Sequence, residues 1–150
     1  MKDYEINNET LAIIPVSLVK SLIIEKTNEF IVEKNAVKII DNSCKYFGSS
    51  LNGRHDGTKN LIGVSHKAPI IIEETKNIIF FPTNSPRIES CNWISLRNIC
   101  EFKRKDNKSL IIFNNGYNLE IDISYGSLEN QILRATRLES VLRIRKEEKN

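Results

Sequence analysis

The chain has 150 residues, of which 40% are hydrophobic and 27% are charged, so it can bury the core of one domain. This composition excludes a disordered tail, and the net charge of +3 is too small to indicate a partner. No apolar run approaches the roughly 18 residues of a membrane span. The first ten residues also lack the basic and apolar regions of a signal peptide. We therefore expect a single cytoplasmic domain, residues 1–150, with no membrane partner.

Short β-branched runs fill the N-terminal third. Residues 11–16 form an apolar run that predicts a strand. Residues 21–26 and 29–34 are apolar runs separated by two polar residues, which predicts a hairpin. Residues 36–40 predict a further strand. We therefore expect this part of the chain to form an antiparallel meander.

Residues 44–63 have a different character, because glycines and serines replace the apolar alternation. Ser49 or Ser50 can N-cap a short helix here, since serine is a favoured N-cap residue. Two internal glycines would weaken that helix by about 1 kcal/mol each. A short helix and an irregular, partly helical segment near residues 49–62 therefore both remain open.

The middle of the chain predicts further strands. Residues 69–72 and 78–81 are continuous apolar runs, which is typical of strands buried on both faces. Residues 83–91 contain a proline and polar residues and predict a loop, whereas residues 93–102 predict one strand.

The C-terminal third predicts a hairpin and a helix. Residues 110–113 and 119–123 flank Asn115-Gly116, which is a strong hairpin signal. Ser127 can N-cap an amphipathic helix near residues 128–146. Its apolar stripe consists of Leu128, Ile132, Ala135, Leu138 and Leu142. The predicted fold class is α+β, a β-rich single domain of antiparallel strands with a short or irregular helical segment and this C-terminal helix.

The cysteines and histidines do not indicate a disulfide framework or a metal site. Cys44, Cys91 and Cys100 are an odd and sparse set with no CxxC pair. His55 and His66 have no ligand-like spacing to another histidine or cysteine. We expect ordinary buried thiols, no bound metal and no cofactor.

Charge is distributed unevenly along the chain. Residues 1–43 carry −2 and residues 68–133 carry −1, whereas residues 44–67 and 134–150 carry +3 each. Clustered positive charge is what a polyanion-binding surface requires, although an ordinary solvated surface is an alternative.

An enzyme is the weakest interpretation of the sequence. Cys44 could act as a nucleophile with His55 or His66 as base and Asp41 or Asp56 as the orienting carboxylate. However, no nucleophile motif surrounds Cys44, and the glycine-rich segment lacks both phosphate-binding glycine patterns. We therefore predict no enzymatic activity.

Nucleic-acid binding fits the charge pattern better, because lysine and arginine neutralise phosphates and release counterions. For Arg54 a surface salt bridge with Asp56 or a glutamate is an equally good interpretation, and for Lys45, Lys59 and Lys67 a solvated surface is slightly favoured. Trp93 is interpreted as an anchor in a core or an interface. The candidate DNA-binding residues are Lys45, Arg54, His55, Lys59, Lys67, Arg134 and Arg137.

Several long blocks of the sequence resemble the ComK family of competence transcription factors from Gram-positive bacteria. The resemblance runs in colinear order over residues 4–138, most of the chain. The blocks that carry it are IIDNSCKYFGSSLNGRHDGT, VSHKAPIII, FFPT, CNWIS, EFK and FNNGYNLEIDISYGSLENQILRAT.

This resemblance implies a DNA-binding activator of the genes for DNA uptake and recombination. It implies binding to AT-rich boxes of double-stranded DNA, largely through the minor groove, as a homo-oligomer. RNA polymerase and a proteolytic adaptor are further expected partners. The chain ends at Asn150, where longer family members continue with an extension that contributes to adaptor recognition. A protein-interaction regulator or truncated paralogue that pairs with another competence factor is therefore the alternative.

Overall fold

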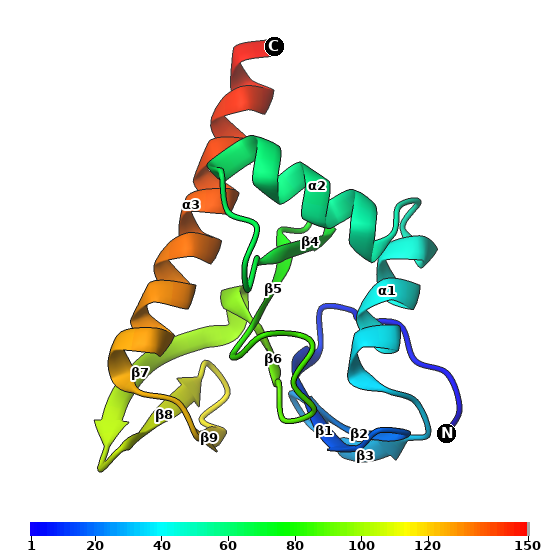
Figure 1. Ribbon diagram of the computed structural model, residues 1–150, viewed down its shortest axis with the longest axis vertical. Coiled ribbons are helices and arrows are strands. Elements are labelled where there is room, and N and C mark those ends of the chain that lie inside the picture. Colours follow the sequence, from blue (N-terminus) through cyan, green and yellow to red (C-terminus); the bar gives the residue numbers. More distant parts are fainter. Residues whose placement is uncertain (150) are drawn as a thin grey trace.

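A six-stranded antiparallel sheet forms the centre of the molecule in a computed structural model, which describes residues 1–149 and the side chains of residues 1–148 (Figure 1). Its strands lie in the order β3-β2-β1-β6-β5-β4. Their bounds are β1 (Thr10–Ser17), β2 (Lys20–Glu25), β3 (Glu29–Val32), β4 (Ile70–Glu73), β5 (Ile78–Pro82) and β6 (Trp93–Ser95). The meander of β1, β2 and β3 confirms the first three predicted strands and their hairpin.

The predicted strand at residues 36–40 is wrong, because this segment begins helix α1 (Ala36–Tyr46). The Asn35 side chain caps the helix by accepting a hydrogen bond of 2.9 Å from the backbone N–H of Val37. The buried residues of α1 recur at helical spacing, a pattern that continues past residue 40. They are Ala36, Ile39, Ile40, Ser43 and Cys44.

The glycine-rich segment forms a regular helix, α2 (Leu51–Ile62), and not the irregular segment that was the alternative. Ser50 is its N-cap and accepts a 2.9 Å hydrogen bond from the backbone N–H of Gly53. Gly63 ends the helix with a φ of 72°, a left-handed conformation that glycine adopts without steric cost. One serine cap is worth about 1 kcal/mol, less than the two glycines cost, so the packing of the buried residues Thr58 and Ile62 also stabilises the helix.

The single strand predicted at residues 93–102 is divided by a 3-10 turn, Leu96–Asn98. Asn98 is buried and donates hydrogen bonds to the carbonyl of Thr10 and the hydroxyl of Ser95. The chain then enters a second, three-stranded sheet in the order β7-β8-β9. Its strands are β7 (Ile99–Lys105), β8 (Lys108–Phe113) and β9 (Asn118–Ile121), which includes the predicted Asn-Gly hairpin.

The C-terminal helix α3 (Tyr125–Lys149) starts earlier than its apolar stripe predicts. The predicted cap, Ser127, lies within the helix, and its backbone N–H donates to the Ser124 hydroxyl at 3.2 Å. Ser124 therefore caps the helix, and the first turn of α3 precedes Leu128, the first residue of the apolar stripe.

Two apolar cores lie on opposite faces of the six-stranded sheet. Strand β5 contributes to both, since Ile78 and Phe80 pack with α1, whereas Ile79 and Phe81 pack with the second sheet and α3. Figure 1 shows α2 extending from α1 towards α3 along one end of this arrangement. The continuous apolar runs of β4 and β5 are explained by burial on both faces, as predicted.

The three cysteines are free thiols, and only two of them are buried. Cys44 and Cys91 lie in the core, whereas Cys100 is exposed, which corrects the expectation of three buried thiols. Within residues 1–148, no three His, Cys, Asp or Glu side chains converge as metal ligands. None of the helices in the described part of the chain is both long enough and apolar enough to cross a membrane.

Candidate nucleic-acid interface

The loop after α2, residues 63–69, is held between α2 and α3 by hydrogen bonds from both helices. On one side His55 Nε2 lies 2.8 Å from the Ser65 carbonyl oxygen. A carbonyl can only accept, so this nitrogen carries the proton. On the other side Arg134 Nη1 donates to the His66 carbonyl at 3.1 Å. Two predicted site residues therefore bind the same loop from opposite helices.

Gln131 fixes this loop more deeply and was not identified from the sequence. Its side chain is 0% exposed, and Nε2 donates to the carbonyls of Lys67 (2.8 Å) and Pro82 (2.7 Å). These bonds join α3 to the loop and to the end of β5. A glutamine in an otherwise apolar stripe was the available signal, because a buried amide requires hydrogen-bond partners.

The two basic segments of the sequence meet where α2 and α3 contact each other. Arg145 Nη1 in α3 donates to Asn60 Oδ1 in α2 at 3.0 Å. Lys59 and Arg137 are exposed on these helices, and neither forms an ion pair within residues 1–148. We use the name basic face for the basic residues of α2, of the loop after it and of the part of α3 that contacts them. It comprises Arg54, His55, Lys59, Lys67, Arg134, Arg137 and Arg145.

Arg54 has a different environment from its neighbours. It is half-buried, and within residues 1–148 its Nε is one of two buried side-chain polar atoms without a hydrogen-bond partner. No ion pair joins it to Asp56 in the described part of the chain, so the salt-bridge interpretation is wrong. Burial raises the pKa of the nearby Cys44 thiol, and the positive charge of Arg54 lowers that pKa by a smaller amount.

Lys45 lies apart from the basic face, on the last turn of α1. It pairs with Asp41 at 3.0 Å, and the other Asp41 oxygen accepts the backbone N–H of Leu51 at 2.9 Å. The Leu51 hydrogen bond and then Lys45 lower the pKa of Asp41. Asp41 therefore joins α1 to the start of α2, and Lys45 pairs with Asp41 within α1.

The nucleophile interpretation of Cys44 receives no support from its surroundings. Cys44 is 0% exposed within an apolar core. Burial raises the pKa of its thiol to about 12, whereas a catalytic cysteine needs a lowered pKa. His55 Nε2 is engaged with the Ser65 carbonyl of the loop after α2.

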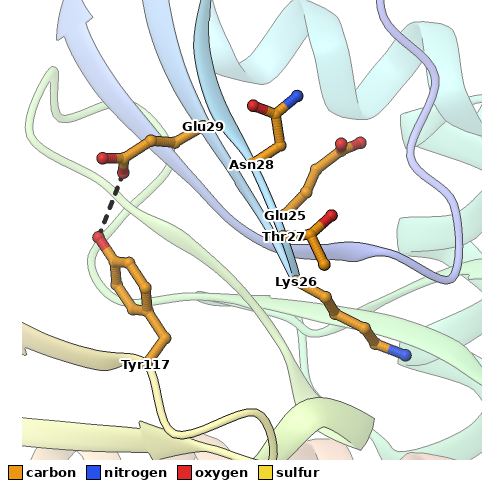
Figure 2. A pocket seen from close by; sticks show the side chains of 6 residues that line it. All are labelled: Glu25, Lys26, Thr27, Asn28, Glu29 and Tyr117. Carbon is orange, nitrogen blue, oxygen red and sulfur yellow. Dashed lines mark hydrogen bonds between the residues drawn. The ribbon is translucent and has the colours of Figure 1, made fainter.

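A hollow that shares no residue with the basic face carries the opposite charge. It lies between the turn after β2 and the turn before β9, with a volume of ≈ 450 Å³. Figure 2 shows Tyr117 pointing towards Glu29, to which its hydroxyl donates at 3.4 Å. Glu25 also lines this hollow, and Lys26 is the one cation among its lining residues. We call it the acidic hollow; its charge disfavours a polyanion.

The comparisons with known proteins identify the family. The family model described as "ComK protein" matches residues 1–147. The chain belongs to the ComK family. It is 39% identical over 138 residues to a "Competence transcription factor" of Bacillus subtilis (strain 168), which covers 89% of this chain and 72% of that relative. No solved structure matches the chain. The resemblance seen in the sequence is thereby confirmed.

This ComK-family chain has a further basic cluster that the segmental charge concealed. Residues 103–108, KRKDNK, form the tip of the β7–β8 hairpin. The lysines there are paired with Glu101 or Glu120, and the Arg104 guanidinium lies 4.7 Å from the centre of the Tyr125 ring. Averaging over residues 68–133 hid this cluster. These lysines have ion-pair partners, whereas Lys59 and Arg137 have none within residues 1–148, so the basic face remains the better candidate.

Proposed function

We propose that this chain is a DNA-binding transcription activator of competence genes that acts in the cytoplasm as one domain. The observation that carries the proposal is the basic face. It unites two segments of charge +3 that are far apart in the sequence. Unpaired cations on a rigid surface are suited to phosphate contacts. The family relative, a competence transcription factor, supports the same assignment.

AT-rich boxes read through the minor groove are the proposed target. Minor-groove edges distinguish A·T from G·C pairs, and A-tracts narrow the groove and attract arginine. The basic face offers Arg134 and Arg137 for this role. Inosine–cytosine pairs retain the minor-groove pattern but change the major groove, so we expect binding to survive this replacement. We also expect distamycin, a minor-groove ligand, to compete.

The decisive measurement is a mobility shift on AT-rich and GC-rich duplexes over a range of salt concentrations. We expect selective binding to the AT-rich duplex. In Lys59→Ala, the slope of log K against log[salt] should become shallower by about 1, because one phosphate contact is lost. Lys26→Ala in the acidic hollow is the control and should leave the slope unchanged. Equal affinity for both duplexes, or an unchanged slope in Lys59→Ala, would contradict the proposal.

Exposed apolar residues on α3 support a homo-oligomer. Leu133 is 61% exposed and Ile144 is 47% exposed. They are eleven residues apart, about three helical turns, and therefore lie on one side of α3. The same observation favours the second candidate, a regulator that pairs with another competence factor without activating transcription itself. A sizing run on the DNA complex, with a reporter assay for activation, distinguishes the two. RNA polymerase and a proteolytic adaptor are the further proposed partners.

A further inference from the structure

A groove on the side of the sheet covered by α1 and α2 has the size and composition of a ligand site. It lies between the two helices, the loop after α2 and the loop after β5, with a volume of ≈ 620 Å³. Small-molecule sites have volumes of about 300–1,000 Å³. We call it the cationic groove. Its lining residues include Leu51, His55, His66, Lys67, Arg87 and Trp93.

The charged side chains of the cationic groove are all basic. Lys67 and Arg87 line it together with His55 and His66, and no aspartate or glutamate does. Neither Lys67 nor Arg87 forms an ion pair within residues 1–148. Two permanent positive charges without partners match a phosphate monoester, which is a dianion at neutral pH.

Trp93 provides the second, independent observation. Its side chain lines the groove but is only 1% exposed, and its Nε1 is the other buried polar atom without a partner within residues 1–148. A buried indole N–H normally has an acceptor, and leaving it unpaired has a free-energy cost. A ligand atom that accepts this hydrogen bond would remove that cost. The groove therefore combines a cationic rim with an unused donor beside an apolar ring.

We propose that the cationic groove binds a small phosphorylated molecule with an aromatic or apolar body, such as a mononucleotide. Lys67 and Arg87 hold the phosphate, and the body packs against Leu51 and Trp93 and accepts the indole N–H. The proposal goes beyond DNA binding and does not depend on it, although His55 and Lys67 belong to both surfaces.

The test uses the fluorescence of Trp93, which is the single tryptophan of the chain. We expect adenosine monophosphate to change this fluorescence in a saturable manner and inorganic phosphate to compete with it. Adenosine, which absorbs equally but lacks the phosphate, should produce no saturable change. Arg87→Ala, a substitution in an exposed loop, should weaken binding by about tenfold, because a hydrogen bond to a charged group is lost. The control Lys20→Ala should bind within about twofold of the original chain.

Calorimetry on Trp93→Phe separates the indole hydrogen bond from the fluorescence signal, and weaker binding is expected there too. Three results would overturn the proposal. The first is no heat and no fluorescence change with adenosine monophosphate. The second is an equal response to adenosine. The third is a Trp93 response to duplex DNA but not to the mononucleotide, which would assign the groove to the DNA interface. DNA binding itself is scored separately by mobility shift, so failure of one proposal does not imply failure of the other.

Discussion

The cationic groove and the acidic hollow are both formed by loops that come from distant parts of the sequence, yet they favour opposite ligands. Their volumes are ≈ 620 and ≈ 450 Å³, so size does not distinguish their ligands. Charge does, because Lys67 and Arg87 line the first, whereas Glu25 and Glu29 line the second. A net charge of +3 conceals two surfaces of opposite sign. The local distribution of charge therefore says more about partners than the total.

The two regions also differ in how firmly they are fixed. Buried Gln131 donates to the Lys67 carbonyl, in the loop beside the cationic groove, at 2.8 Å and to the Pro82 carbonyl at the end of β5 at 2.7 Å. The acidic hollow is bridged by an exposed 3.4 Å bond from Tyr117 to Glu29 and by a 2.7 Å bond from Asn115 to the Lys26 carbonyl. Buried hydrogen bonds are costly to break, whereas exposed ones exchange readily with water. The loop beside the cationic groove should therefore already have its bound conformation before a ligand arrives.

The largest expected effect comes from reversing charge on the basic face. Lys59→Glu combined with Arg137→Glu should weaken DNA binding by about 100-fold at moderate salt, because each change removes a phosphate contact and adds repulsion. Lys20→Glu combined with Lys26→Glu changes the net charge equally at residues outside the basic face and should have a much smaller effect. Mobility shifts at matched salt make the comparison. Equal losses in the two double variants would show that only total charge matters.

An intermediate effect is expected from Gln131→Leu. The substitution leaves the carbonyls of Lys67 and Pro82 without their donors and should reduce the free energy of unfolding by about 2–3 kcal/mol. Urea denaturation measures this loss. Asn130→Leu, at the adjacent exposed position, should change stability by about 0.5 kcal/mol or less. If both variants are equally stable, Gln131 does not hold the loop. The proposed difference in rigidity between the cationic groove and the acidic hollow would then be wrong.

The smallest effect is expected at the acidic hollow. Burial and then Glu29 raise the pKa of Tyr117 above its ordinary value. Folding therefore favours the protonated phenol, a contribution that is present at neutral pH and is lost as pH rises through the raised pKa. Glu29→Gln should shift the ionisation of Tyr117 to lower pH. Difference absorbance titrations, with Tyr117→Phe as the blank, report this shift, and an unchanged titration would remove Glu29 as a cause.

Local signals were sufficient for most elements of this fold. The β1–β2–β3 meander, the Ser50 cap of α2, the Asn-Gly hairpin and the apolar stripe of α3 are all short-range patterns, and they are present in the structure. The strand predicted at residues 36–40 was wrong, because five residues are too few to distinguish a strand from the first turn of a helix. The break at Leu96–Asn98 was missed, since it depends on a hydrogen bond from Asn98 to the distant Thr10.

By itself the sequence determined the family, the α+β class and the existence of two segments of charge +3, because these are properties of composition, colinear motifs and local spacing. Only the tertiary structure decided which charges share a surface. It brought His55 and Arg134 to one loop, separated Lys45 from them, and left Trp93 with an unused donor in the groove that Lys67 and Arg87 line. The physical reason is that charges and hydrogen-bond donors act over a few ångströms in space. The distances between side chains are set by the packing of α2 and α3 around a buried glutamine and not by separation along the chain.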